Sequence, residues 1–278
     1  MKILTITRLT FRETVRRKIM LTALILGAAF LIIFNLGFYF IKYQGQISSS
    51  PLEGIQARGV YNVFLLMGLY ALNFLALAMA ALVSADTLAG EISSGTIQSI
   101  ASKPIRRVEI VFGKWLGFAI LLLGYILMMA GGLILSVWVQ TGYQPDNILA
   151  GLALMYFETL IMMTLTLLFS STLSTLATGA AVFGLYGLAF IGSWVEQIGS
   201  YLNSRTAVQI GILASLLMPA EALWRRASYE LTSPLVAMLN GGPFISRSVP
   251  SPMMIIYAGV YLGLVFWFAV RRFQKRGL

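Results

Sequence analysis

The sequence predicts an all-α polytopic membrane protein with six transmembrane helices, and two observations carry this prediction. Of the 278 residues, 58% are hydrophobic and 11% are charged, whereas soluble domains carry about 25% charged residues. The hydrophobic residues also gather in runs with few or no charges that are long enough to cross a membrane. A mean hydropathy of +0.84 indicates the same class. The chain therefore requires a lipid environment.

Six apolar runs account for the predicted helices. At about 1.5 Å per residue the first five runs reach across a hydrocarbon core of about 30 Å, and the sixth is the shortest acceptable. In chain order the predicted spans are 19–41, 60–83, 115–139, 148–169, 176–195 and 253–270. We expect residues 1–278 to form a single transmembrane domain, because the sequence contains no internal repeat and no low-complexity tract.

The positions of Lys and Arg predict the orientation of the spans. Most of the 20 basic residues precede the first span, lie between the second and third spans or follow the sixth span. Because basic residues favour the cytoplasmic side, we expect both termini in the cytoplasm. Segment 206–218 is apolar but too short to span, and it stops at Pro219. It is predicted to be an interfacial or re-entrant helix within the outer segment 196–252.

Composition and motifs exclude several functional classes. The chain has no Cys and no His, so it lacks the usual ligands of zinc, haem and copper. It also lacks a Walker A phosphate-binding motif, a His-Glu-x-x-His motif and a Gly-x-Ser-x-Gly motif. We therefore expect no ATPase or hydrolase activity in this chain. Because its net charge of +10 gathers at the ends of the spans, we expect no nucleic-acid partner.

The stretch before the first span is predicted to form an amphipathic helix that lies along the inner membrane surface. Its cations fall on one face of a helical wheel. The opposite face combines apolar and threonine side chains, namely Ile3, Leu4, Thr7, Phe11, Thr14 and Val15. A basic flank that only fixes the topology is the alternative interpretation.

Polar and small residues within the spans predict contacts between helices. Asn35, Asn62 and Asn73 are expected to form hydrogen bonds between spans. Two glycine pairs, Gly113/Gly117 and Gly259/Gly263, have the spacing that lets another helix approach closely. These features predict packing within the subunit rather than ligand binding.

The inner loop at 84–114, between the second and third spans, has the most informative pattern. Leu88, Ile92, Ile100 and Ala101 recur near helical spacing, which predicts a short amphipathic helix. Pro104 is expected to end or redirect that helix. A compact element held between two spans could transmit force to them, and an ordinary inner loop is the alternative.

This loop resembles the cytoplasmic loop of ATP-binding cassette (ABC) type 2 exporter permeases. That family shows an acidic residue, Gly-Thr, a short helix, Lys/Ser-Pro-Ile-x-Arg and Gly-Lys. The matching residues here are Glu91, Gly95-Thr96, Lys103-Pro104-Ile105-Arg106-Arg107 and Gly113-Lys114. The six spans, the Ser-rich turn after the fourth span and the outer Pro219-Ala-Glu221-Ala-Leu-Trp224 also agree with the family. The resemblance extends in order over nearly the whole chain.

The resemblance implies a permease subunit of an ABC exporter in the cytoplasmic membrane of a prokaryote. Such a subunit pairs with a second copy or a paralogue, contacts lipids and is driven by a separate cytoplasmic ATPase that binds ATP and Mg²⁺. The chain itself would need no cofactor. The amphipathic N-terminus would be the connecting helix, and the loop would hold the coupling helix that docks into the ATPase. The residues assigned to ATPase coupling are Asp86, Glu91, Gly95, Thr96, Ile100, Lys103, Pro104 and Arg107.

Glu158 is the one acidic residue deep in a predicted span. A charge at the bilayer centre costs about 2.5–3.5 kcal/mol on insertion scales, so Glu158 is expected to face protein or a wet cavity. With Met155 and Met162 on its side of the helix, it is a candidate for the substrate pathway. A protonated or hydrogen-bonded Glu158 that locks two spans together is one alternative. A proton-coupled secondary transporter, or another polytopic membrane protein that uses Glu158, is the other.

Overall fold

The computed structural model describes residues 2–16, 18–44, 51–93, 106–233 and 248–275, and these ranges are helical with short connections. No strand occurs in them, so the predicted all-α class is confirmed. The helices are α1 (Lys2–Arg16), α2 (Lys18–Gln44), α3 (Pro51–Ser93), α5 (Arg107–Thr141), α6 (Ile148–Ser170), α7 (Thr175–Tyr201), α8 (Arg205–Leu217), α9 (Ala220–Leu231) and α11 (Met253–Lys275).

Six helices in these ranges are long and apolar enough to cross a membrane, which confirms the predicted number of spans. They cover Lys18–Phe40, Ala57–Thr87, Arg107–Thr141, Ile148–Ser170, Thr175–Tyr201 and Pro252–Lys275. The third span begins earlier than predicted because the helix continues through the charged residues that precede the apolar run. Polar flanks can stay helical once the helix extends beyond the hydrocarbon core.

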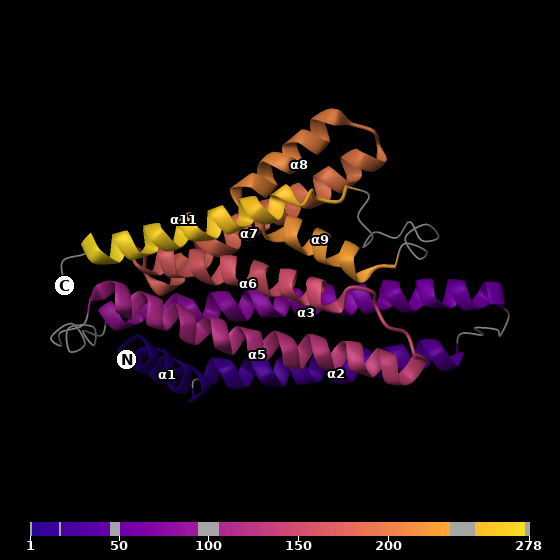
Figure 1. Ribbon diagram of the computed structural model, residues 1–278, viewed down its shortest axis with the longest axis horizontal. Coiled ribbons are helices and arrows are strands. Elements are labelled where there is room, and N and C mark those ends of the chain that lie inside the picture. Colours follow the sequence, from indigo (N-terminus) through magenta and orange to yellow (C-terminus); the bar gives the residue numbers. More distant parts are fainter. Residues whose placement is uncertain (1, 17, 45–50, 94–105, 234–247, 276–278) are drawn as a thin grey trace.

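The spans form an elongated bundle in which α6 is central (Figure 1). Helix α6 contacts α3, α5, α7, α9 and α11. Helices α2, α3, α5 and α6 run along the long axis, and α1 and the end of α11 lie at the same end of that axis (Figure 1). This placement agrees with an even number of crossings.

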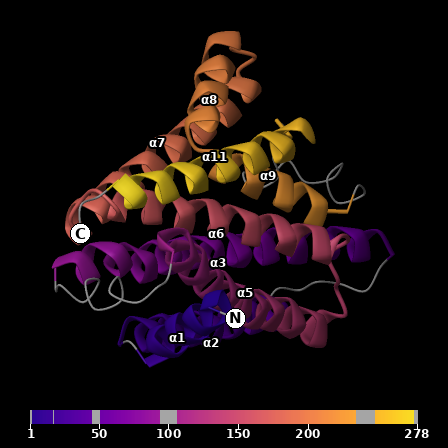
Figure 2. The ribbon, with the colours of Figure 1, turned by 60° about the vertical axis from the view of Figure 1, so that its left-hand side comes forward.

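The segment after α7 contains two short helices, α8 and α9, that are bent sharply against each other. Helix α8 packs along α7, and α9 then bends away from α8 by 106° and packs on α6. Figure 2 shows α7 and α8 as a hairpin that projects from the bundle. Helices α7 and α8 approach closely at Gly192, since a Cβ at this position would collide with the Cβ of Ala214. The short helix expected at 206–218 is therefore present, and the bend follows it.

Helix α1 docks on α5 through its threonines. Thr7, Thr10 and Thr14 are buried, and the Thr7 hydroxyl donates a hydrogen bond to the Gly113 carbonyl at 3.1 Å. A Cβ at Gly117 would lie 2.9 Å from the Cβ of Thr10, so the predicted close approach of a helix is confirmed there. It is not found at Gly259 and Gly263, where no described atom comes closer than 4.0 Å to a new Cβ.

The rest of the predicted apolar face of α1 differs from expectation. Leu4, Phe11 and Val15 are exposed, with 77%, 38% and 46% of their surface accessible. The side chains that approach α5 at its glycines are small or β-branched, and the larger apolar side chains are left outside. We expect lipid to cover those exposed side chains.

Candidate functional site

The predicted coupling loop is anchored at both ends by hydrogen bonds to other helices. Asp86 lies on α3, and its Oδ1 accepts a hydrogen bond from the hydroxyl of Thr175, the first residue of α7, at 3.3 Å. Arg107 begins α5, and its Nη1 donates to the carbonyl of Gln274 on α11 at 3.1 Å. The two ends of the loop are thus attached to α7 and to α11.

The loop itself is described only at its edges. Helix α3 continues unbroken to Ser93, so Leu88 and Ile92 extend α3 instead of starting a separate helix. Glu91 belongs to this last part of α3, where only the backbone is described. Gly95, Thr96, Ile100, Lys103 and Pro104 lie outside the described residues. Their assignment to ATPase coupling stays a prediction.

Glu158, Met155 and Met162 lie together in the protein core on α6. The exposed fraction of each is 0%. The Nδ2 of Asn73 on α3 donates a hydrogen bond to Glu158 Oε2 at 2.9 Å. Within the described residues, Glu158 Oε1 and Asn73 Oδ1 have no hydrogen-bond partner. In a single chain this face of α6 therefore packs against α3.

The other predicted asparagine contacts are also present. Asn62 Nδ2 donates to the hydroxyl of Tyr143 at 2.8 Å, which joins α3 to the connection between α5 and α6. Burial raises the pKa of the Tyr143 hydroxyl above its usual value. The Nε2 of Gln140 on α5 donates to Asn35 Oδ1 on α2 at 2.9 Å. Asn35 and Asn73 thus link spans, as the sequence predicts, whereas Asn62 links a span to the connection that follows α5.

Glu221, a second buried carboxyl group, was missed as a site residue from the sequence alone. It lies in the first turn of α9 with an exposed fraction of 2%. The hydroxyl of Tyr186 on α7 donates to Glu221 Oε1 at 2.6 Å. Tyr70 on α3 lies beside it and packs on Trp224, with 5.0 Å between ring centroids. In the sequence, Glu221 lies two residues after Pro219 and among apolar residues, and this position was the available signal of a buried carboxyl group.

An aromatic pocket of about 460 Å³ opens beside this second carboxyl group. Its lining residues come from α2, α3 and α7, and they are Phe30, Tyr70, Ala71, Phe74, Leu75, Tyr186 and Phe190. Tyr70 and Tyr186 are thus shared between the pocket and the surroundings of Glu221. The predicted pathway residues Met155, Glu158 and Met162 do not line it.

The sequence profile of a family described as "ABC-2 family transporter protein" matches residues 4–278. The chain belongs to the ABC-2 transporter family. It is accordingly a multi-pass membrane permease of the ABC transporter type. A comparison with curated proteins finds no match. The match extends from α1 to α11, so the predicted coupling loop and the carboxyl groups of Glu158 and Glu221 belong to the matched part of this ABC-2 permease.

A buried ion pair fixes the outer segment of the permease. Arg225 on α9 forms an ion pair with Glu196 on α7, in which Nη2 donates a hydrogen bond to Oε2 at 2.8 Å and Nη1 lies 2.7 Å from Oε1. The Ser248 hydroxyl also donates to Glu196 Oε1, at 2.6 Å. This network ties α7, α9 and the residues before α11 into one unit. Both carboxylate oxygens of Glu196 are thus engaged, which indicates a structural role for the pair.

Proposed function

We propose that this ABC-2 permease is the membrane-spanning subunit of an ABC exporter and forms the substrate translocation pathway. The family match over residues 4–278 is the observation that carries the proposal. The chain has no Walker A motif, so a separate cytoplasmic ATPase that binds ATP and Mg²⁺ supplies the energy. Two permease chains, identical or paralogous, pair in the cytoplasmic membrane of a prokaryote, with both termini in the cytoplasm.

The hydrogen bonds at the ends of the coupling loop support this proposal. The 43 residues of α3 form one continuous helix that leads from the loop into the membrane. A push on the loop would act directly on α3 and α5. Through the Asp86–Thr175 and Arg107–Gln274 hydrogen bonds, it would also act on α7 and α11. Displacement by the ATPase would thus reach four spans at their ends, as a rigid-body rearrangement requires.

Met155, Glu158 and Met162 remain the proposed pathway residues on α6. Because they are fully buried in a single chain, substrate reaches them only when α3 and α6 move apart. Opening of the pathway would therefore break the hydrogen bond between Asn73 and Glu158. A proton-coupled secondary transporter that uses Glu158 is the second candidate, because this carboxyl group lies buried in a span.

Purification of the full-length permease from its native membranes tests the proposal. Affinity-tagged permease should co-purify with a subunit that carries a Walker A motif, and the complex should hydrolyse ATP. Transport by the permease alone, driven by a proton gradient and without ATP, would support the secondary transporter and contradict the exporter. Mass spectrometry of the purified complex identifies the partner, and vanadate inhibition assigns the hydrolysis to it.

A further inference from the structure

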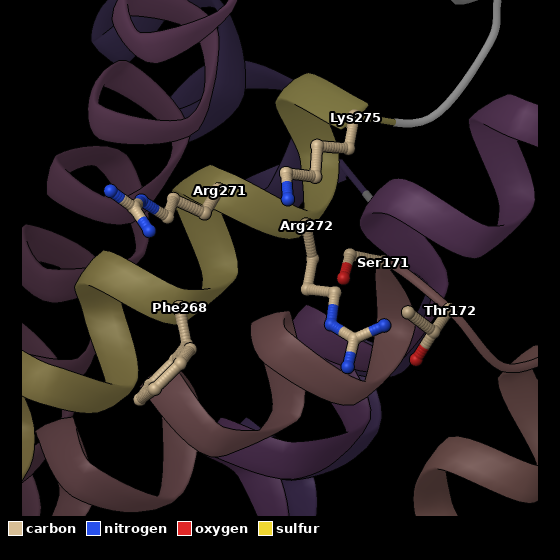
Figure 3. A pocket seen from close by; sticks show the side chains of 6 residues that line it. All are labelled: Ser171, Thr172, Phe268, Arg271, Arg272 and Lys275. Carbon is tan, nitrogen blue, oxygen red and sulfur yellow. The ribbon is translucent and has the colours of Figure 1, made fainter.

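A basic pocket lies between the last turns of α11 and the turn that joins α6 to α7. Its volume is about 590 Å³, and its lining residues are Ser171, Thr172, Phe268, Arg271, Arg272 and Lys275 (Figure 3). Three of these side chains are cations and two carry hydroxyl groups, and none is acidic. The pocket lies apart from the buried carboxyl groups and from the aromatic pocket.

Two of the three cations are available to a ligand. The guanidinium of Arg271 lies over the ring of Trp267, 4.0 Å from its centroid, and points away from the hydroxyl groups (Figure 3). Arg272 instead extends from α11 toward Ser171 and Thr172 (Figure 3). Within the part of the chain that the structure describes, Arg272 and Lys275 have no ion pair and no hydrogen bond through their side chains. Two uncompensated cations at one hollow favour an anion with several oxygen atoms.

The depth of the pocket indicates where that anion comes from. The span that ends at Lys275 has 24 residues, and at about 1.5 Å per residue it exceeds a hydrocarbon core of about 30 Å. The last turn of α11 therefore lies at the level of the lipid headgroups. Phe268, two turns before Lys275, gives the pocket an apolar wall, and 48% of its surface is exposed. An apolar wall below two cations matches a phospholipid, with its phosphate at the surface and its acyl chains in the core.

We propose that the basic pocket binds the phosphate group of an anionic phospholipid, held by Arg272 and Lys275. A soluble phosphate would use the same cations but would leave the apolar wall at Phe268 without a partner. Bound lipid would lie next to Gln274, whose carbonyl accepts the hydrogen bond from Arg107 at the coupling loop. The proposal does not depend on the exporter function, because it concerns binding by the permease alone.

Native mass spectrometry of the full-length permease in detergent tests the proposal. The protein is titrated with phosphatidylglycerol, with phosphatidylcholine and with phosphatidylglycerol in the presence of inorganic phosphate. We expect one phosphatidylglycerol to bind about tenfold or more tightly than phosphatidylcholine, and the double variant R272Q/K275Q to lose roughly ten- to thirtyfold in affinity. The matched control R8Q/R12Q removes the same charge from exposed positions on α1 and should change binding less than twofold.

Three outcomes would overturn the proposal. Equal losses in R272Q/K275Q and R8Q/R12Q would show that only the overall charge attracts the lipid. Full competition by inorganic phosphate at a concentration similar to that of the lipid would show that a soluble anion is the ligand. If R272Q/K275Q does not fold, T172E serves instead, because it places an acidic group at the exposed edge of the pocket. T172E should weaken phosphatidylglycerol binding about tenfold, and unchanged binding would contradict the proposal.

Discussion

Asn73 on α3 donates a hydrogen bond to Glu158 on the central helix α6 at 2.9 Å, and both side chains are fully buried. The bond joins two neighbouring spans at the acidic residue that the sequence marks as exceptional. It also leaves one oxygen of each side chain without a partner in the described ranges. The carboxyl group of Glu158 is thus held by an amide from a neighbouring helix. A substitution of Glu158 should therefore lower the stability of the permease when it removes the hydrogen-bond acceptor and not when it keeps one.

Replacement of Glu158 separates hydrogen bonding from charge. In E158A the buried amide of Asn73 loses its acceptor, and we expect a loss of about 1–3 kcal/mol in the free energy of unfolding. In E158Q the side-chain carbonyl can still accept from Asn73 Nδ2, and the new amide can donate to Asn73 Oδ1. We expect E158Q to match or exceed the stability of the wild type. Thermal unfolding of the purified permease in detergent measures both variants.

The control for this pair is M155L, one turn away in the same core, which keeps the volume and changes no hydrogen bond of Glu158. It should lie within about 1.5 kcal/mol of the wild type. Equal losses in E158A and E158Q would contradict the interpretation of the Asn73–Glu158 contact as a stabilising hydrogen bond.

The ion pair between Glu196 and Arg225 should dominate the stability of the outer segment. Both side chains are about 95% buried, so R225A leaves a buried carboxylate without its partner and should cost about 3–5 kcal/mol. The double variant E196A/R225A should cost less than the sum of the single variants, because neither charge is then left alone. Thermal unfolding of the purified permease in detergent reports the effect.

R226A provides the comparison on the same helix. Its partner is Glu230, and both side chains are about one-fifth exposed, so solvent weakens this pair. We expect R226A to cost less than about 1 kcal/mol. A loss in R226A as large as that in R225A would show that burial does not decide the strength of these pairs.

The contact of α1 with α5 can be tested with two alanine substitutions on the same helix. In G117A the new Cβ would lie 2.9 Å from the Cβ of Thr10, so α1 must shift, and overpacking of this kind costs about 1–3 kcal/mol. In G124A nothing lies within 4 Å of the new Cβ, and alanine favours the helix by about 1 kcal/mol.

Amide hydrogen exchange in α1 measures this difference directly. Exchange in α1 should accelerate in G117A and stay as in the wild type in G124A. The same exchange rates in both variants would mean that Gly117 does not hold α1 in place.

The spans could be predicted because lipid imposes one strong constraint, an uncharged run of sufficient length. The burial of Asn62 and Asn73 followed from the same constraint, since a polar side chain in a span needs a partner in another helix. The sequence could also indicate that Gly113 and Gly117 admit a close neighbour. It could not indicate that the neighbour is α1, because a glycine pattern specifies a gap and no partner.

Of the two buried carboxyl groups Glu158 and Glu221, only Glu158 could be predicted from the sequence. Glu158 is found by its position inside an apolar run, whereas Glu221 follows a proline in a segment of mixed composition. Its burial depends on the 106° bend after α8, which returns α9 to the bundle. On α1, the helical wheel predicts one apolar face, but its threonines are buried whereas Leu4, Phe11 and Val15 are exposed. Tertiary contacts decided both results.

Cross-linking of the coupling loop tests the central claim that a separate ATPase drives this permease through the loop. The chain contains no cysteine, so single cysteines can be introduced by S99C in the loop and, as a control, by Q144C in the exposed connection between α5 and α6. A short thiol cross-linker should join S99C, and not Q144C, to the subunit with the Walker A motif, and the yield should change when ATP is added. Labelling of S99C only from outside the cell, or full transport by permease without any ATPase bound, would contradict the account.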